Sequence, residues 1–244
     1  MKKIQYKEDI FVYENFLNKE TCQKILDFWK WQEENEKLTW NQISFYESYA
    51  FGFHPYDMDL IKFGLPADFF TQLKEAFKKI TAKAHGKDVV EVSYHAQKWI
   101  EGAFASFHSD NSSNDSPEYN SFGKSKMATF LYLNDDFKGG KLVFKDHPIE
   151  IEPKVGMLAT FQGGYYNQHE VQLIEKGDRY TIGSFWDFAD CKYSETDLEK
   201  WKIELKEIRD KQEIQYKEWN SLKDNGYRPN PKKDSDPIEI KKDF

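Results

Sequence analysis

Apolar positions in the first third of the chain predict a strand followed by a helix. The segment "IFVYENFL" (10–17) has the β-branched and aromatic content of a strand that enters a turn. In the segment that follows, Ile25, Phe28 and Trp29 recur at helical spacing. We therefore predict a helix over about 18–35, with Asn18 as its N-cap.

A second helix is predicted over 66–86, in "PADFFTQLKEAFKKITAKAHG". Leu73, Phe77 and Ile80 form its apolar stripe, Pro66 lies near its start and Gly86 ends it. Residues 38–65, between the two helices, are rich in aromatic side chains but show no period that indicates either a helix or a strand.

From about residue 88 to 188 the pattern changes to short segments rich in β-branched and aromatic residues, such as "KMATFLYLN", "GKLVFKD" and "RYTIGSFWDF". Turn sequences separate them, among them "DDFKGG", "PKVG" and "EKGD". Several short strands at close spacing are typical of an antiparallel sandwich or barrel. The order of elements is therefore helices first, then a β-rich core, within one domain over 1–190.

After residue 190 the chain becomes a charged helix. Ser194 and Asp197 form an S-x-x-D capping box, and an apolar stripe follows over about 195–222 (Leu198, Trp201, Leu205, Ile208). We expect this helical extension, over 191–224, to pack on its own domain or on a second copy rather than to form a free coiled coil. Residues 225–244 are rich in Pro, Lys and Asp, which is typical of a flexible tail.

Composition narrows the class of protein. The chain has 244 residues, 17% of them aromatic, which is enough for one large core and argues against a disordered chain. The net charge of -7 disfavours non-specific nucleic-acid binding. Cys22 and Cys191 are far apart and form no CxxC motif. No apolar run predicts a signal peptide or a membrane span, so we expect a cytoplasmic protein.

The segment "FHSDN" carries a candidate pair of metal ligands. His108 and Asp110 share one face of a strand because alternate side chains point the same way. The third ligand must come from another strand. The candidates are His54, His85, His95, His147 and His169. His169 is favoured because it opens the apolar segment "HEVQLI", with room for about four strands between it and Asp110.

Two histidines and one carboxylate leave open positions on an octahedral metal, as in non-haem Fe(II) oxygenases. Such an enzyme uses a co-substrate like 2-oxoglutarate, whose distal carboxylate needs a buried cation. Arg179 follows His169 by ten residues, and the turn "EKGD" between them suggests that their strands are hairpin neighbours. A guanidinium matches a carboxylate in a bidentate manner. Thr181 and Gly183 lie on the same face, where small side chains would leave a slot for the co-substrate.

At this point the sequence resembles the prolyl 4-hydroxylase-like branch of the Fe(II)/2-oxoglutarate dioxygenases. The resemblance covers roughly residues 8–188 and rests on "WIEGAFASFHSD", "TFLYLNDDFKGGKLVF", "PKVGMLATF" and "HEVQLIEKGDRYTI". A weaker match is "IFVYENFLNKETCQKIL" near the start. It implies a fold of α+β class with a mainly β core. That core is a double-stranded β-helix, a cupin-like jelly roll, supported by N-terminal helices and followed by the long C-terminal helix.

The resemblance also implies roles for particular residues. His108, Asp110 and His169 would hold iron, and Arg179 would bind the distal carboxylate of 2-oxoglutarate. Tyr132 matches a family tyrosine whose hydroxyl reaches the same carboxylate, and strand alternation places it on one face with Ala128 and Phe130. The sequence departs from the family at two places. Trp99 stands where a Tyr is common in Y-x-x-G, and the tryptophan after the basic residue is displaced by one place, to Trp186.

The implied activity is hydroxylation of an unactivated C–H bond, with succinate and CO2 as co-products. The preferred substrate is a prolyl residue of a peptide or protein. Alternatives are a free amino acid or another small molecule, and a catalytically inactive jelly-roll binding module. Fe(II), 2-oxoglutarate and O2 are the expected cofactors, with ascorbate as a further candidate. A nucleic-acid substrate and a membrane are not expected.

The substrate region is predicted from aromatic residues and one loop. Trp99, Tyr165 and Tyr166 are candidates for substrate contacts, because aromatic grooves suit extended Pro-rich peptides. Phe104 is a weaker candidate, since it fits a core position equally well. The polar loop 111–126 directly follows two candidate ligands and is long enough to act as a lid. The C-terminal helix is a candidate homodimer contact.

Overall fold

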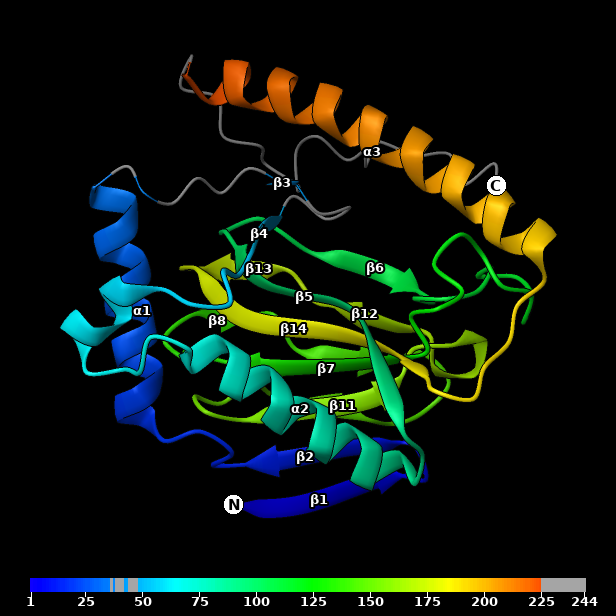
Figure 1. Ribbon diagram of the computed structural model, residues 1–244, viewed down its shortest axis with the longest axis horizontal. Coiled ribbons are helices and arrows are strands. Elements are labelled where there is room, and N and C mark those ends of the chain that lie inside the picture. The colour runs from blue at the N-terminus through cyan, green and yellow to red at the C-terminus, as the bar shows by residue number, and fades with distance from the viewer. Residues whose placement is uncertain (36, 38–41, 44–47, 225–244) are drawn as a thin grey trace.

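The computed structural model describes residues 1–35, 37, 42–43 and 48–224. Two long helices, α1 and α2, precede most of the sheet, and a third, α3, follows it (Figure 1). The helices are α1 (Lys19–Glu34), α2 (Phe69–His85) and α3 (Glu195–Asp224), with short 3-10 turns η1 (Met58–Phe63) and η2 (Tyr165–Asn167). The predicted flexible tail lies outside the described residues.

Eight strands form the larger sheet, in the order β1-β2-β11-β7-β14-β5-β4-β3. Their bounds are β1 Lys2–Lys7, β2 Ile10–Glu14, β3 Gln42–Ile43, β4 Ser48–Gly52, β5 Val89–Trp99, β7 Met127–Tyr132, β11 Leu158–Gln162 and β14 Arg179–Phe188. A smaller sheet has the order β10-β9-β12-β6. Its strands are β6 Ala105–His108, β9 Leu142–Phe144, β10 Glu150–Ile151 and β12 His169–Val171. Two further strands, β8 (Lys138–Gly139) and β13 (Ile174–Lys176), pair with each other.

The predicted helices are confirmed. Asn18 caps α1, and its side-chain oxygen accepts a hydrogen bond of 2.8 Å from the Thr21 amide. The second helix begins at Phe69 rather than at Pro66, and it ends at Gly86 in the left-handed conformation that glycine favours. Residues 1–9 were not predicted as a strand, yet β1 pairs with β2 along the edge of the larger sheet.

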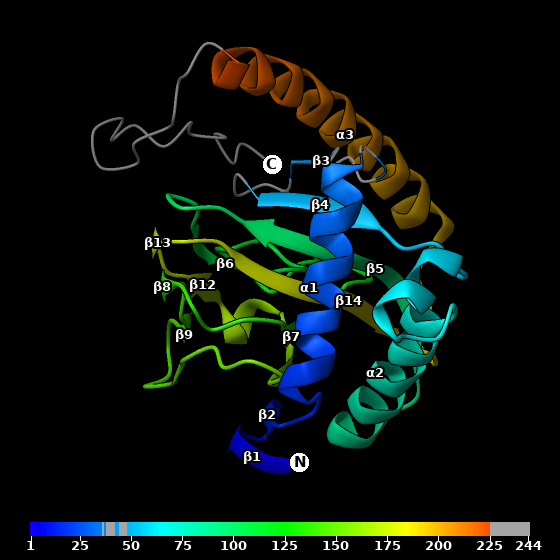
Figure 2. The same ribbon diagram turned by 90° about the vertical axis from the view of Figure 1, so that its left-hand side faces the viewer.

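One face of the larger sheet is covered by α1 and α2, as Figure 2 shows from the side. Alternation along β7 explains the two faces: Met127 and Leu131 pack toward the helices, whereas Ala128 and Tyr132 pack into the space between the two sheets. The inter-sheet layer also contains Phe144 of the smaller sheet. The mainly β core with supporting N-terminal helices is therefore as predicted.

Two local predictions on strand arrangement are wrong. The segment "HEVQLI" is not one strand, since β12 ends at Val171 and β13 begins at Ile174 in another sheet. His169 and Arg179 are also not on hairpin neighbours. Their strands, β12 and β14, belong to the smaller and the larger sheet respectively. The stretch between them leaves one sheet and joins the other, which the spacing in sequence alone does not reveal.

The charged helix α3 packs on its own chain near its start. Ser194 caps it as expected, because its hydroxyl accepts a hydrogen bond of 3.0 Å from the Asp197 amide. Trp201 is buried, while Ile203 and Ile214 are exposed. In the part of the chain that the structure describes, no helix has the length and apolar character needed to cross a membrane.

Candidate metal and co-substrate site

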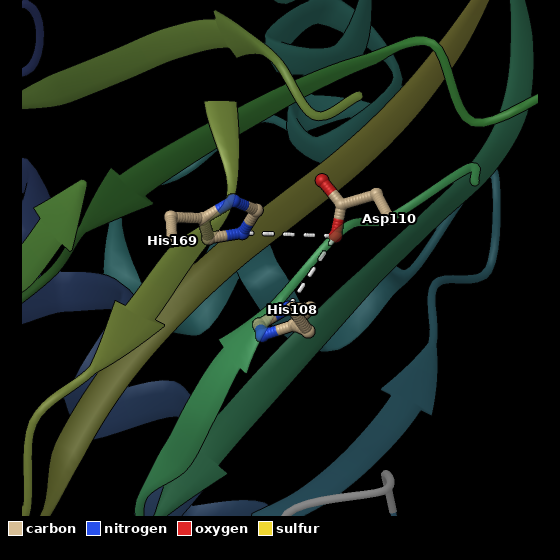
Figure 3. Close-up of side chains that lie close together, drawn as sticks. All are labelled: His108, Asp110 and His169. Carbon is tan, nitrogen blue, oxygen red and sulfur yellow. Dashed lines mark ion pairs between the residues drawn. The ribbon is translucent and has the colours of Figure 1, made fainter. Parts of the chain in front are cut away.

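The three predicted metal ligands lie together, as Figure 3 shows. One ligand atom from each of His108, Asp110 and His169 can be chosen so that all three lie within 4.8 Å of one another. Nε2 of His108 is 3.6 Å from Asp110 Oδ1, and Nε2 of His169 is 3.7 Å from the same oxygen. Among the described residues, this is the one group of three or more His, Cys, Asp or Glu side chains whose ligand atoms lie close enough together to hold a metal ion.

The pairing of β6 with β12 brings the two histidines together. His108 and His169 are direct antiparallel partners, and their rings have centroids 4.5 Å apart. Asp110 lies two residues beyond, just past the end of β6. Its amide donates a hydrogen bond of 2.7 Å to the Gly163 carbonyl, which holds the carboxylate beside the two rings.

Hydrogen bonds fix which nitrogen of each histidine faces the carboxylate. Nδ1 of His108 lies 2.7 Å from the Ser106 carbonyl, and Nδ1 of His169 lies 3.1 Å from the Asn167 carbonyl. A carbonyl oxygen only accepts, so each Nδ1 carries a proton, and in the neutral ring the lone pair of Nε2 faces Asp110. Such carbonyl partners are typical of metal-binding histidines.

Burial favours the neutral form of His169. It lowers the pKa of His169 from 6.5 to about 4, against the opposing effect of the Asp110 carboxylate. A neutral imidazole is the form that binds a metal. Asp110 Oδ2 is buried and has no hydrogen-bond partner within the described structure, so one carboxylate oxygen is left for a ligand. This donor set fits a divalent metal such as Fe(II).

The cation predicted for the co-substrate is buried on the opposite sheet. Arg179 is 3% exposed, and its guanidinium carbon lies 5.0 Å from the Tyr132 ring centroid and 5.2 Å from that of Trp99. Nε and Nη1 of Arg179 and the hydroxyl of Tyr132 have no hydrogen-bond partner in the described structure. A buried guanidinium with unused donors is costly unless an anion binds it. The arrangement therefore fits a carboxylate ligand.

Arg179 and Tyr132 lie close enough to influence each other's pKa. Burial raises the pKa of Tyr132, an effect that the Arg179 guanidinium partly offsets. Burial lowers the pKa of Arg179, and Tyr132 partly offsets that effect. An arginine keeps its charge in proteins, and a neutral phenol keeps its proton. Both groups can therefore donate hydrogen bonds to an incoming anion.

Sequence reasoning missed Gln97 of β5. Its Oε1 accepts hydrogen bonds of 3.4 Å from Thr181 Oγ1 and from Trp99 Nε1. Thr181 is fully buried, and it is joined through Gln97 to the tryptophan that contacts Arg179. Strand alternation could have identified Gln97, since it lies two residues before Trp99 and so shares its face.

The expected slot above Gly183 is filled by an aromatic ring. A Cβ at Gly183 would lie 2.6 Å from Cε1 of Phe130, so the glycine accommodates that ring instead of leaving open space. The displaced tryptophan also has a structural explanation. Phe185 packs between the two sheets, whereas Trp186 packs in the core under the helices.

The candidate substrate residues do not form one aromatic groove among the described contacts. Trp99 is buried beside Arg179. Tyr165 and Tyr166 pair with each other in η2, with ring centroids 5.3 Å apart, and Tyr166 is exposed. Phe104 is partly exposed. The two tyrosines lie just before His169 in the chain, whereas Trp99 lies beside Arg179 on the larger sheet.

The remaining histidine candidates are elsewhere. His85 of α2 lies 3.2 Å from Thr160 Oγ1 through its Nε2 and contacts the Phe11 ring. His147 lies 3.0 Å from the Lys7 ammonium. His95 stacks on Phe185, with ring centroids 6.2 Å apart. The preference for His169 as the third member of the cluster is therefore supported by the geometry.

Comparison with known proteins gives a consistent match. Residues 93–187 match the 2OG-Fe(II) oxygenase superfamily. Prolyl 3-hydroxylase 2 of Homo sapiens is 37% identical over 100 residues, which cover 36% of this chain and 14% of that protein. The 2-oxoglutarate and iron-dependent oxygenase domain-containing protein 3 of Xenopus tropicalis is 38% identical over 66 residues, 25% of this chain and 21% of that protein. The match thus spans a small part of these relatives' length.

Solved structures share the fold. A prolyl-4-hydroxylase of Pseudomonas putida superposes with a TM-score of 0.54 at 16% identity, covering 74% of this chain and 92% of that one. A Trichoplax adhaerens prolyl hydroxylase, in complex with a hypoxia inducible factor peptide fragment, gives a TM-score of 0.54 at 15% identity, covering 79% and 86%. At such identities the likeness concerns the fold, and it confirms the predicted double-stranded β-helix.

These matches also confirm the predicted resemblance to the 2-oxoglutarate and Fe(II)-dependent oxygenases, which are enzymes. At the level of the family, they confirm the expected set of Fe(II), 2-oxoglutarate and O2.

Proposed function

Since this chain resembles the prolyl 4-hydroxylase-like Fe(II)/2-oxoglutarate oxygenases, we propose that it hydroxylates a prolyl residue of a peptide or protein. The observation that carries the proposal is the pairing of two incomplete sites. One is a cluster of two histidines and a carboxylate, and the other is a buried guanidinium with unused donors. Bound Fe(II) would supply, with 2-oxoglutarate and O2, the oxidising power to break a C–H bond, with succinate and CO2 as co-products.

The residues have distinct roles in this proposal. His108, Asp110 and His169 hold the metal, and the two backbone carbonyls bonded to Nδ1 orient the imidazoles, so that Nε2 of each neutral ring faces the metal. Arg179 binds the distal carboxylate of 2-oxoglutarate, and the Tyr132 hydroxyl donates to the same group. Thr181 and Gln97 border it. Trp99 and Tyr132 flank the guanidinium and exclude water from it.

The names of the similar proteins support a prolyl substrate. The sequence matches include prolyl 3-hydroxylases, and the structural neighbours include a prolyl-4-hydroxylase and a prolyl hydroxylase in complex with a peptide fragment. Tyr165 and Tyr166 offer paired rings just before His169, one of them exposed, and so suit the apolar ring of a proline. Which carbon of the proline is hydroxylated is left for product analysis to decide.

The proposal is tested first without oxygen. Fe(II) and 2-oxoglutarate are added to the purified chain, and the visible charge-transfer band of the chelate is recorded. We expect a band in the wild type, its loss in His108→Ala, and a need for far more 2-oxoglutarate in Arg179→Ala. Proline-rich peptides and free amino acids are then incubated with oxygen and analysed by mass spectrometry. The absence of both band and bound metal would overturn the proposal and favour a binding module.

Two further expectations remain proposals. The homodimer would use the exposed apolar side chains of α3, Ile203 and Ile214. Size-exclusion chromatography of the full chain with both changed to Glu tests it, since an unchanged elution volume would remove this interface. Cell fractionation tests the cytoplasmic location. Enrichment of the protein in the secretory fraction would contradict it.

A further inference from the structure

The start of α3 is docked on the loop that follows the metal ligands, and Figure 1 shows the two side by side. Trp201 is the buried residue among the described side chains of α3. Its ring covers Gly123 so closely that a Cβ there would lie 2.6 Å from Cη2. Ser121 and Glu204 add a short hydrogen bond between the loop and the helix.

Beneath this contact lies a buried cation surrounded by aromatic rings. The ammonium of Lys126 is 3.7 Å from the Tyr119 ring centroid and 5.3 Å from that of Tyr193, and it donates to the Gly123 carbonyl at 3.2 Å. Trp201 closes the group, with centroids 5.2 Å from Tyr193 and 6.4 Å from Tyr119. Cation–π contacts strengthen when the cation is desolvated, and Lys126 is 7% exposed.

The enclosure is anchored to the larger sheet. The hydroxyl of Tyr193 donates to the Asp187 carboxylate, with both oxygens at 2.9 Å, and Asp187 is a buried residue of β14. The rings around Lys126 are therefore fixed at one side by the sheet and closed at the other by the helix.

From Lys126, two backbone hydrogen bonds lead to the metal ligand. The Gly163 amide donates to the Lys126 carbonyl at 3.1 Å, and the Asp110 amide donates to the Gly163 carbonyl at 2.7 Å. Ser109 Oγ donates to the same Gly163 carbonyl at 3.0 Å. Asn111 closes the loop on itself, because its side-chain amide donates to the Ser125 carbonyl at 3.1 Å.

We propose that Trp201 is a positioning residue for Asp110, acting through Lys126 and Gly163. The docked helix is thus a structural part of the metal site, and loop 111–126 is held in place by it. The inference rests on the proposed function for its metal-binding consequence. The positional coupling itself, from Trp201 to the Asp110 backbone, exists with or without metal.

The test compares Trp201→Ala with Ile203→Ala, which changes an exposed apolar residue on the same helix. Hydrogen exchange of the Asp110 and Gly163 amides is measured in metal-free protein. Fe(II) affinity is measured without oxygen by equilibrium dialysis. We expect at least tenfold faster exchange at both amides and about tenfold weaker Fe(II) binding in Trp201→Ala, with Ile203→Ala unchanged. Unchanged exchange in Trp201→Ala would overturn the inference.

A second pair of variants keeps the test decisive if Trp201→Ala fails to fold. Lys126→Met retains the apolar stem and removes the cation, whereas Lys126→Arg retains a cation for the rings. We expect Lys126→Met to reproduce the faster exchange and the weaker Fe(II) binding of Trp201→Ala. We expect Lys126→Arg to keep the exchange rate and the Fe(II) affinity of the wild type. Equal behaviour of the two variants would contradict the inference. Wild-type protein that binds no Fe(II) would overturn the proposed function alone, because the exchange measurement would still judge the coupling.

Discussion

Asp110 and Gly163 are packed so closely that any side chain at Gly163 would overlap the Asp110 carboxylate. The same pair is joined by a hydrogen bond of 2.7 Å from the Asp110 amide to the Gly163 carbonyl. Gly163 thus supports the ligand through its backbone and leaves space for it through its missing side chain.

Gly163→Ala is therefore expected to displace the Asp110 carboxylate and weaken Fe(II) binding by at least about tenfold. Gly164→Ala is the matched control. A Cβ at Gly164 would lie 3.4 Å from Asn111 Oδ1, a distance that a small adjustment accommodates. Anaerobic Fe(II) titration of both variants distinguishes them. Equal affinities would contradict the assigned role of Asp110.

Arg179→Met is expected to separate stability from binding. The guanidinium is buried with two nitrogens lacking hydrogen-bond partners, so an apolar replacement should stabilise the ligand-free protein by about 1 kcal/mol, or about 2–4 °C in Tm. The rise in Tm that 2-oxoglutarate gives to the Fe(II)-loaded wild type should disappear. Thermal unfolding with and without 2-oxoglutarate measures both effects. A ligand-free variant that is less stable than wild type would show that Arg179 serves the fold.

Tyr132→Phe is expected to weaken 2-oxoglutarate binding while leaving the stability of the ligand-free protein unchanged. The hydroxyl has no partner in the ligand-free structure, so its removal should change the free energy of unfolding by less than about 0.5 kcal/mol. Loss of one hydrogen bond to a carboxylate should weaken 2-oxoglutarate about tenfold. Titration of the charge-transfer band gives the affinity, and urea unfolding gives the stability. Unaltered affinity would remove Tyr132 from the co-substrate site.

Buried histidines should make the fold sensitive to acid. Burial lowers the pKa of His85 from 6.5 to about 4, so the unfolded chain binds more protons than the folded one between these values. Stability contributed by neutral His85 is present above pH 6.5 and falls as the pH drops toward 4. His85→Gln, which can still bond Thr160 but does not titrate, should make the fall in stability shallower, while His95 and His169 continue to contribute. The urea unfolding midpoints of wild type and His85→Gln are measured across that pH range. If the midpoints of both proteins changed with pH by the same amount, His85 would not be responsible for the acid sensitivity.

Local signals were enough to predict the helices and the grouping of His108, Asp110 and His169. Asn18 and Gly86 mark helix ends through their own chemistry, and the alternation of side chains brings His108 and Asp110 to one face. His169 could be selected because it opens a strand. Its exact partner, His108 across the β6–β12 pair, was not predictable, since register depends on contacts distant in sequence.

Predictions that depended on neighbouring sheets were less successful. The link between His169 and Arg179 looks like a hairpin in sequence, but the chain passes from one sheet to the other there. The slot at Gly183 is filled by Phe130 from the adjacent strand, a packing choice that no local pattern shows. The surroundings of Lys126 were not predictable for the same reason, because Tyr119 and Tyr193, which it contacts, come together only in the fold.

The division of the site between two sheets has a thermodynamic consequence. His108 and His169 belong to the smaller sheet, whereas Arg179 and Tyr132 belong to the larger one. A single small molecule that reaches both acts as a removable cross-link between the layers. We therefore expect the metal and 2-oxoglutarate to bind cooperatively, each tightening the other by the same factor.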